Sequence, residues 1–180
     1  GAAMGGAGRP PPEAAAAPAY AIVPSTLHTM DAPCDRQRYP GMKQLAPSAA
    51  MEEIGRIVPL DGSVEDVLPQ LGFRLHRVPG TKIAEFVYEF ALPAGGRALV
   101  ANDAFGCAHA ADDSRFPGWL IVRHISVPGD HLAIPRIYHW RFITDMAAGG
   151  AFAGHLAATP GLRLGPVSHG DPGPTDPVRA

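Results

Sequence analysis

Two stretches of this chain decide its predicted fold: Ala98-Leu-Val-Ala-Asn-Asp103-Ala-Phe and Leu162-Arg-Leu-Gly-Pro-Val-Ser-His169-Gly-Asp-Pro. In each, an apolar segment typical of a buried strand leads into a side chain that can bind a metal. The first strand delivers the carboxylate of Asp103, and the second delivers the imidazole of His169. Two such ligands, each placed at a strand tip, indicate a hydrolase-like site in a mixed α/β domain.

Alternating helix-like and strand-like segments surround these two stretches. The predicted strands are 20–23, 43–46, 73–78, 83–92, 97–102 and 162–167. The predicted helices are 32–39, 47–55, 63–71, 116–125, 135–145 and 146–158. Ser48 is the expected N-cap of the second helix. In the strand 83–92 the acids are spaced by four and the aromatics by two, which predicts one buried face.

The composition restricts the possible functions. The chain has 180 residues and a formal net charge of −2, and no basic stripe, so a general nucleic-acid interface is not expected. No apolar run approaches the ~20 residues that span a bilayer, and no secretory signal is recognisable. Cys34 and Cys107 form no CxxC pair and are expected to be reduced. These features predict a cytoplasmic protein.

The two ends differ from the middle of the chain. Residues 1–18 are rich in Gly, Ala and Pro and have almost nothing to bury, so a disordered leader is expected. Residues 173–180 are a polar, proline-rich tail that we also expect to be disordered. The interpretation is therefore one domain, residues 19–172, between two disordered segments.

The middle of the chain resembles the metallo-β-lactamase fold superfamily, over about Ala21 to Pro172, in a divergent and uncharacterised branch. Five short segments carry the resemblance: Val23-Pro-Ser-Thr-Leu-His28, Gln37-Arg-Tyr-Pro-Gly41, Val78-Pro-Gly-Thr81, Asn102-Asp-Ala-Phe105 and Ser168-His-Gly-Asp-Pro172. Each is weak alone, and their order and spacing together are fairly specific. The resemblance implies a four-layer αββα sandwich with metal, zinc or iron, at one edge of the sheets.

The resemblance also implies a ligand set, of which this sequence keeps only part. Asp103 matches the bridging aspartate of the family, and His169 matches its last histidine. The first family motif, His-x-His-x-Asp-His, corresponds to Leu27-His-Thr-Met-Asp-Ala32. Aligning on Asp31 places Leu27, Thr29 and Ala32 on the three histidines, and aligning on His28 loses every other match. Thr81 stands where a further family histidine follows a Pro-Gly pair.

A second departure from the family lies before the first motif. Family members have several strands there, whereas only 27 residues precede His28 in this sequence. We therefore expect a domain that lacks part of its N-terminal sheet. Either self-association or a partner chain covers the incomplete sheet, or the sequence is a truncated gene product.

Two functions remain open at this level. The first is a degenerate, non-catalytic scaffold or binding module, and this is the interpretation that the lost histidines favour. The second is a metal-dependent hydrolase with a reduced mononuclear site, held by Asp103 and His169 and completed by His28 or Asp31. In the non-catalytic case Asp103 caps the following turn.

Two further groups of residues are assigned to structure. His76 is expected to be a surface or half-buried histidine, and the aromatics of Tyr138, Trp140 and Phe142 are expected to pack in the core. No Gly-x-Ser-x-Gly nucleophile elbow occurs in the chain.

Overall fold

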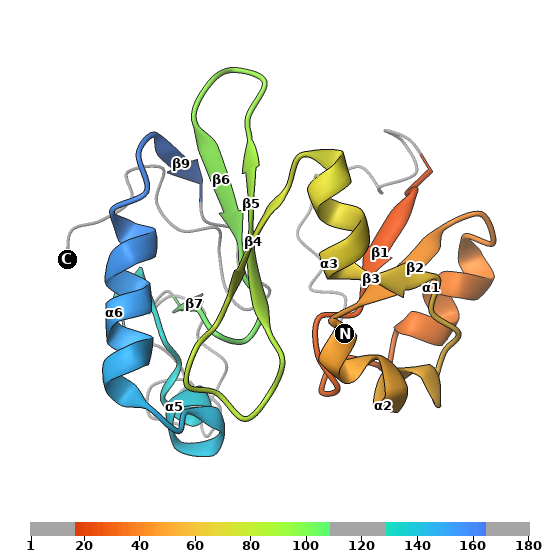
Figure 1. Cartoon of the computed structure of the whole chain (residues 1–180), viewed down its shortest axis with the longest axis horizontal. Coiled ribbons are helices and arrows are strands. Elements are labelled where there is room, and N and C mark those ends of the chain that lie inside the picture. The colour runs from red at the N-terminus through yellow and green to blue at the C-terminus, as the bar shows by residue number, and fades with distance from the viewer. Residues whose placement is uncertain (1–16, 109–128, 165–180) are drawn as a thin grey trace, which may run out of the picture. The chain divides into compact units, whose positions relative to one another are not determined.

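The computed structural model describes residues 17–108 and 129–164, and these divide between two compact units, residues 1–67 and residues 68–180. Each unit combines helices with a β-sheet, which confirms the predicted mixed α/β class (Figure 1). The predicted helix 116–125, His169 and both predicted disordered ends (apart from residues 17 and 18) lie outside the described residues.

Unit 1 is a small parallel sheet with helices between its strands. Its elements are β1 (Tyr20–Ile22), α1 (Ala32–Arg38), β2 (Lys43–Ala46), the 3-10 turn η2 (Ser48–Ala50), α2 (Met51–Gly55), β3 (Gly62–Ser63) and α3 (Val64–Val67). The strands are parallel and lie in the order β1-β2-β3. Parallel neighbours need a crossover connection, and the helices supply it.

The core of unit 1 joins its helices to its central strand. The buried apolar side chains are Val23, Ala32, Ala46, Ala50, Ile54 and Val58. Gln44 is also buried, and its side-chain amide donates to the carbonyl of Ala32 at 2.6 Å, which ties β2 to the start of α1. The predicted strand 43–46 matches β2 in full, with Lys43 exposed and the three residues after it buried.

The predicted role of Ser48 is wrong. The residue at the N-cap is Pro47, and it makes no side-chain capping bond. Ser48 instead donates its backbone N–H and its hydroxyl to the carboxylate of Glu65. A residue distant in sequence therefore replaces the local cap, and the predicted helix divides into η2 and α2.

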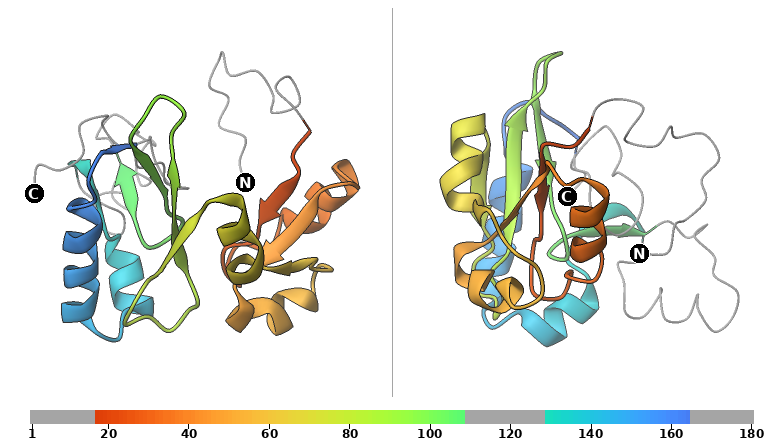
Figure 2. Two further views of the ribbon diagram at one scale, coloured as in Figure 1. Left: turned by 45° about the horizontal axis from the view of Figure 1, so that its top comes forward. Right: turned by 90° about the vertical axis from the view of Figure 1, so that its right-hand side faces the viewer.

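Unit 2 is a mostly antiparallel sheet with two helices on one face (Figure 2). Its elements are the 3-10 turn η3 (Leu68–Leu71), β4 (Arg74–Arg77), β5 (Phe86–Ala91), β6 (Arg97–Val100), β7 (Gly106–Ala108), β8 (Gly129–Ala133), α5 (Arg136–Phe142), α6 (Met146–Ala157) and β9 (Leu162–Leu164). The main sheet has the order β4-β5-β6-β9, with β9 parallel to β6 and the other pairs antiparallel. A separate antiparallel pair joins β7 to β8.

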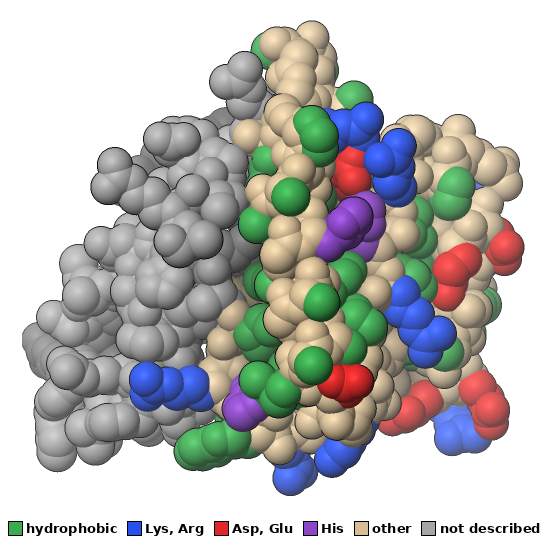
Figure 3. All heavy atoms as spheres, turned by 60° about the vertical axis from the view of Figure 1, so that its left-hand side comes forward, with side chains coloured by type: hydrophobic (Ala, Val, Ile, Leu, Met, Phe, Trp, Pro, Cys, Tyr) green, Lys and Arg blue, Asp and Glu red, His purple; other side chains and the backbone are tan. Residues whose placement is uncertain are grey.

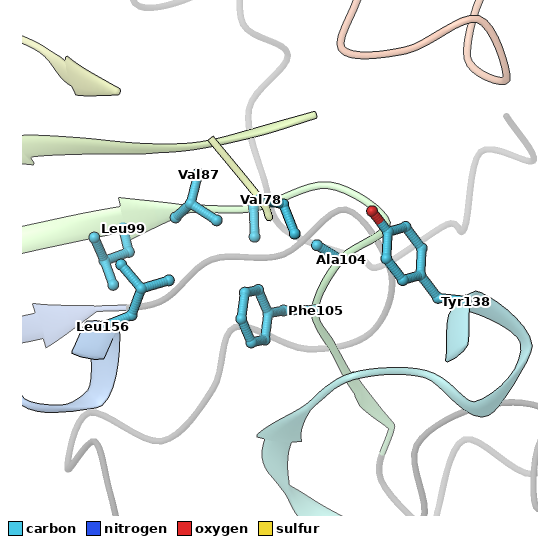
Figure 4. Close-up of a cluster of buried hydrophobic side chains, with 8 residues drawn as sticks. Val78, Val87, Leu99, Ala104, Phe105, Tyr138 and Leu156 are labelled. Carbon is cyan, nitrogen blue, oxygen red and sulfur yellow. The ribbon is translucent and has the colours of Figure 1, made fainter. Parts of the chain in front are cut away.

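The core of unit 2 lies between this sheet and its two helices (Figure 4). Val87 and Leu99 project from the sheet towards Leu156 of α6, and Phe105 and Tyr138 extend the cluster towards α5. Burying these side chains supplies the main stabilisation of the unit, at roughly 25 cal/mol for each Å² of apolar surface removed from water.

The sequence patterns located the strands of the main sheet of unit 2, including the start of β9, and missed the pair β7-β8. The strands at 73–78, 83–92 and 97–102 and the helix at 146–158 are confirmed within a few residues. Strands β7 and β8 were not predicted, and neither was β3 of unit 1, since these strands are short or lack an alternating pattern. The predicted helix 135–145 ends earlier, at Phe142, because Ile143 is extended and forms a bridge with Thr81.

Gly80 explains why the chain turns at this bridge. Its carbonyl accepts from the backbone N–H groups of Thr144 and Asp145, at 2.7 and 3.2 Å, and its φ is +64°. A Cβ at this position would lie 2.8 Å from the carbonyl oxygen of Asp145. Glycine is therefore required here by both backbone conformation and space.

The prediction of a single buried face on β5 is wrong. Phe86, Val87, Tyr88 and Glu89 are consecutive and all buried, so side chains on both faces are enclosed. The acids Glu85 and Glu89 share their face with Val87 and are 0% and 2% exposed. Two buried carboxylates on one strand are the most unusual feature of this unit, because carboxylates are almost never buried without partners.

Candidate functional site

The structure places three of the four predicted metal ligands. His28 is half-buried in the turn between β1 and α1, and Asp31 is exposed at the N-cap position of α1, where its side chain makes no capping bond. Both belong to unit 1. Asp103 is half-buried in unit 2, in the turn after β6, and His169 lies outside the described residues.

No metal centre is formed within the part of the chain that the structure describes. Among residues 17–108 and 129–164, no three His, Cys, Asp or Glu side chains are grouped so that they could hold an ion. The set of Asp103, His169, His28 and Asp31 therefore stays a prediction, and so does its zinc or iron.

Two of the residues that stand in for family histidines have structural tasks. Ala32 is 5% exposed and packs in the core of unit 1. The hydroxyl of Thr81 donates to the carbonyls of Val78 and Ile83, at 3.3 and 2.8 Å, and so holds its own turn. At both positions the side chain supports the fold and has no ligand group aimed at a metal.

The carboxylate of Glu85 lies beside the predicted ligand Asp103. One of its oxygens, Oε1, accepts from the backbone N–H of Ala104 at 2.8 Å, and the other, Oε2, accepts from the hydroxyl of Tyr138 at 2.9 Å. Glu85 thus joins the start of β5, the turn after β6 and helix α5. Because both of its oxygens are occupied by neutral donors, this carboxylate fixes the turn that carries Asp103.

The environment of Glu85 favours its neutral form. Burial raises the pKa of its carboxyl group, the nearby charge of Asp103 adds to the rise, and the hydrogen bonds from Ala104 and Tyr138 offset only part of it. Burial and the neighbouring Glu85 likewise raise the pKa of the Tyr138 hydroxyl far above its ordinary value. Tyr138 therefore remains a hydrogen-bond donor at every physiological pH.

A second carboxylate, Glu89, has charged partners. Its Oε2 accepts from His76 Nε2 at 2.7 Å, and its Oε1 accepts from Arg97 and lies 3.5 Å from Arg74 Nη1. We call Arg74, His76, Glu89 and Arg97 the Glu89 cluster. In Figure 3, histidine, basic and acidic side chains adjoin one another on this side of the molecule.

The partners of Glu89 keep it ionised. Burial raises the pKa of its carboxyl group, but the bonds from His76 and Arg97 and the charges of the two arginines outweigh burial, so the pKa is lowered overall. The ring of His155, from α6, lies 6.3 Å from the ring of His76, centroid to centroid, in an edge-to-face arrangement.

A carboxylate that orients a histidine is also part of a hydrolytic triad, whose remaining member is a nucleophilic hydroxyl bonded to the histidine. Among the described residues, no serine or threonine hydroxyl is hydrogen-bonded to His76, which is bonded to Glu89. The pair has the base and the orienting group of a triad and lacks its nucleophile.

Sequence reasoning placed His76 correctly as half-buried and missed the importance of Glu85 and Glu89. The signal was present, since two acids four positions apart in a strand share one face with an apolar residue between them. Of the three aromatics predicted to pack in the core, Tyr138 is 2% exposed and Phe142 packs against the core, whereas Trp140 is 76% exposed on the other side of α5.

Comparison with models of known protein families gave no matching family, and comparison with curated proteins gave no matching relative. In the described ranges, the helices are too short or too polar to cross a membrane. The cytoplasmic location and the absence of a nucleic-acid partner stay predictions.

Proposed function

We propose that this chain is a non-catalytic scaffold or binding module on a metallo-β-lactamase-like αββα fold. Three features support this fold. A parallel sheet with intervening helices precedes a mostly antiparallel sheet with helices on one face, and Asp103 follows a strand of the second sheet. The region that corresponds to the first family motif lies between β1 and α1.

The observation that carries the functional proposal is the use made of the polar groups around Asp103. The hydroxyl of Thr81 donates a hydrogen bond within its own turn. Both oxygens of Glu85 accept hydrogen bonds, one from Ala104 and one from Tyr138. A catalytic group must be able to exchange partners with a substrate during the reaction. The groups in this region instead stabilise one conformation, which suits a scaffold.

Association with a partner belongs to the same proposal. Within the described residues β1 is hydrogen-bonded on one side only, to β2, so the other side of this strand offers unpaired backbone groups. A second copy of the chain or a different partner would cover this edge.

A metal-dependent hydrolase is the alternative, and the half-buried position of Asp103 at a strand end favours it. Asp103 and His169, with His28 or Asp31, would then hold one zinc or iron ion, which lowers the pKa of a bound water. In that case Glu85, through its bond from the backbone N–H of Ala104, would hold the turn that carries a metal ligand.

Metal analysis of the purified full chain separates the two functions. After exposure to zinc or iron and removal of loosely bound ions, the scaffold proposal expects well below one ion for each chain and no ester or phosphodiester hydrolysis. One bound ion for each chain, lost in Asp103→Ala and in His169→Ala, would establish the hydrolase alternative. Glu53→Ala, which removes an exposed carboxylate from α2, is the control.

A further inference from the structure

The Glu89 cluster holds more positive charge than its single carboxylate neutralises. Arg74 and Arg97 are permanently charged, and both are directed at the one buried acid, Glu89. Among the described residues, Glu89 is the only carboxylate that forms an ion pair with either arginine or with His76. The cluster therefore keeps at least one net positive charge.

The unused hydrogen-bond donors of the cluster face solvent. The Arg74 side chain is 65% exposed and the Arg97 side chain is 39% exposed, while Glu89 beneath them is 2% exposed. A guanidinium group has five N–H donors, and among the described residues the guanidinium groups of Arg74 and Arg97 bond to Glu89 alone. His76 and the exposed His155 add imidazole nitrogens at the side of the same cluster.

Glu89 fixes this arrangement before any ligand arrives. Its bonds reach His76 and Arg74 on β4 and Arg97 on β6, so three neighbouring strands hold the donors in place. Groups that are already oriented lose less freedom when they bind, which favours affinity.

We propose that the Glu89 cluster, together with His155, binds the phosphate group of a small ligand. Guanidinium forks from two strands and imidazoles at the side match a group with several oxygens in a tetrahedral arrangement. A ligand carboxylate, which is planar, matches this arrangement less well, and the cluster already contains the carboxylate of Glu89. The site uses none of the predicted metal ligands, so it is independent of the proposed function.

Calorimetric titration of the full chain with inorganic phosphate tests the site. The protein is treated with EDTA first, so that phosphate bound to a metal is not measured, and acetate is titrated at the same ionic strength. We expect saturable phosphate binding that acetate does not reproduce. Arg74→Gln and Arg97→Gln should each weaken it about tenfold, the effect of one charge-assisted hydrogen bond.

Arg74→Gln is the decisive variant, because this largely exposed side chain lies 3.5 Å from Glu89 and contributes little to folding. Arg56→Gln, which removes an exposed arginine paired with Glu52 on α2, is the matched control and should bind as the wild type does. No saturable binding at millimolar phosphate, equal binding of acetate, or unchanged affinity in Arg74→Gln would each overturn the proposal.

Discussion

Glu85 and Glu89 stand at the two ends of one strand face and have opposite electrostatic environments. Glu85 accepts from a backbone N–H and a tyrosine hydroxyl, both neutral, and its pKa is raised. Glu89 accepts from a histidine and an arginine, with a second arginine nearby, and its pKa is lowered. Burial raises the pKa of both carboxylates, so the difference in their partners explains why the two pKa values shift in opposite directions.

The difference between the environments of Glu85 and Glu89 has a consequence for function. Glu85, with both oxygens hydrogen-bonded, holds β5, α5 and the turn after β6 together. An ionised Glu89 gathers cations at the surface and leaves some of their charge unbalanced. The first carboxylate is therefore a structural element, and the second organises the site that we propose for phosphate.

The largest expected effect comes from removing the Glu85 carboxylate. Glu85→Ala leaves two buried donors, Ala104 N–H and Tyr138 O–H, without acceptors, and we expect the free energy of unfolding to fall by about 3 kcal/mol. Urea unfolding followed by circular dichroism measures this. A loss below about 1 kcal/mol would mean that water replaces the carboxylate and that the comparison is wrong.

Replacing each glutamate by glutamine is the most direct way to distinguish Glu85 from Glu89. Glu85→Gln keeps an acceptor for Ala104, and the Tyr138 hydroxyl can rotate to accept, so we expect a change within about 0.5 kcal/mol. Glu89→Gln removes the only negative charge between two arginines and should cost about 2 kcal/mol. The same urea titration compares them, and equal losses at the two positions would contradict the assignment.

Removal of one donor at Glu85 should have a smaller effect. Tyr138→Phe deletes the hydroxyl bonded to Oε2 and should lower the free energy of unfolding by about 1 kcal/mol. Tyr20→Phe removes a hydroxyl from a partly exposed tyrosine on β1 and serves as the control, with no measurable loss expected. Equal stability of Tyr138→Phe and the wild type would show that the hydrogen bond contributes nothing.

The smallest expected effects are on the pH dependence of stability, and their signs are opposite. Because the pKa of Glu85 is raised on folding, its contribution is complete below its ordinary value of 4.5 and declines as the pH rises through the folded value. Because the pKa of Glu89 is lowered, its contribution is complete above 4.5 and declines as the pH falls through the folded value.

Unfolding measured across the acidic and neutral range checks these signs. Glu85→Gln should remove a loss of stability on the alkaline side of pH 4.5, and Glu89→Gln should remove a loss on the acidic side. Parallel pH profiles for the wild type and both variants would disprove the assigned directions.

The sequence was sufficient for those parts of the fold that local pattern determines. The strand Lys43–Ala46 and the long helix Met146–Ala157 depend on neighbours in the chain, and each was predicted. The early end of α5 was not predictable, because it depends on a bridge between Ile143 and Thr81. The same holds for Ser48, whose partner Glu65 lies in another helix.

The candidate site was harder to predict for the same reason. The spacing of Glu85 and Glu89 identifies the face that they share, but it does not tell which residues oppose them. His76 and Arg74 come from β4, Arg97 comes from β6 and Tyr138 comes from α5, and only the pairing of these elements assigns each donor to one acid. Periodicity therefore predicted the strand, and tertiary pairing determined its chemistry.

The parallel pairing of β9 with β6 has a consequence for the order in which the chain can fold. The backbone N–H of Arg97 bonds to the carbonyl of Gly161, a residue that leaves the ribosome long after β6 has been made. Until β9 has been made, the edge of β6 that faces it has no strand beside it. Arg97 of the Glu89 cluster belongs to this strand. Contacts between distant parts of a chain slow folding, so completion of this sheet is the step that we expect to limit the rate at which unit 2 forms.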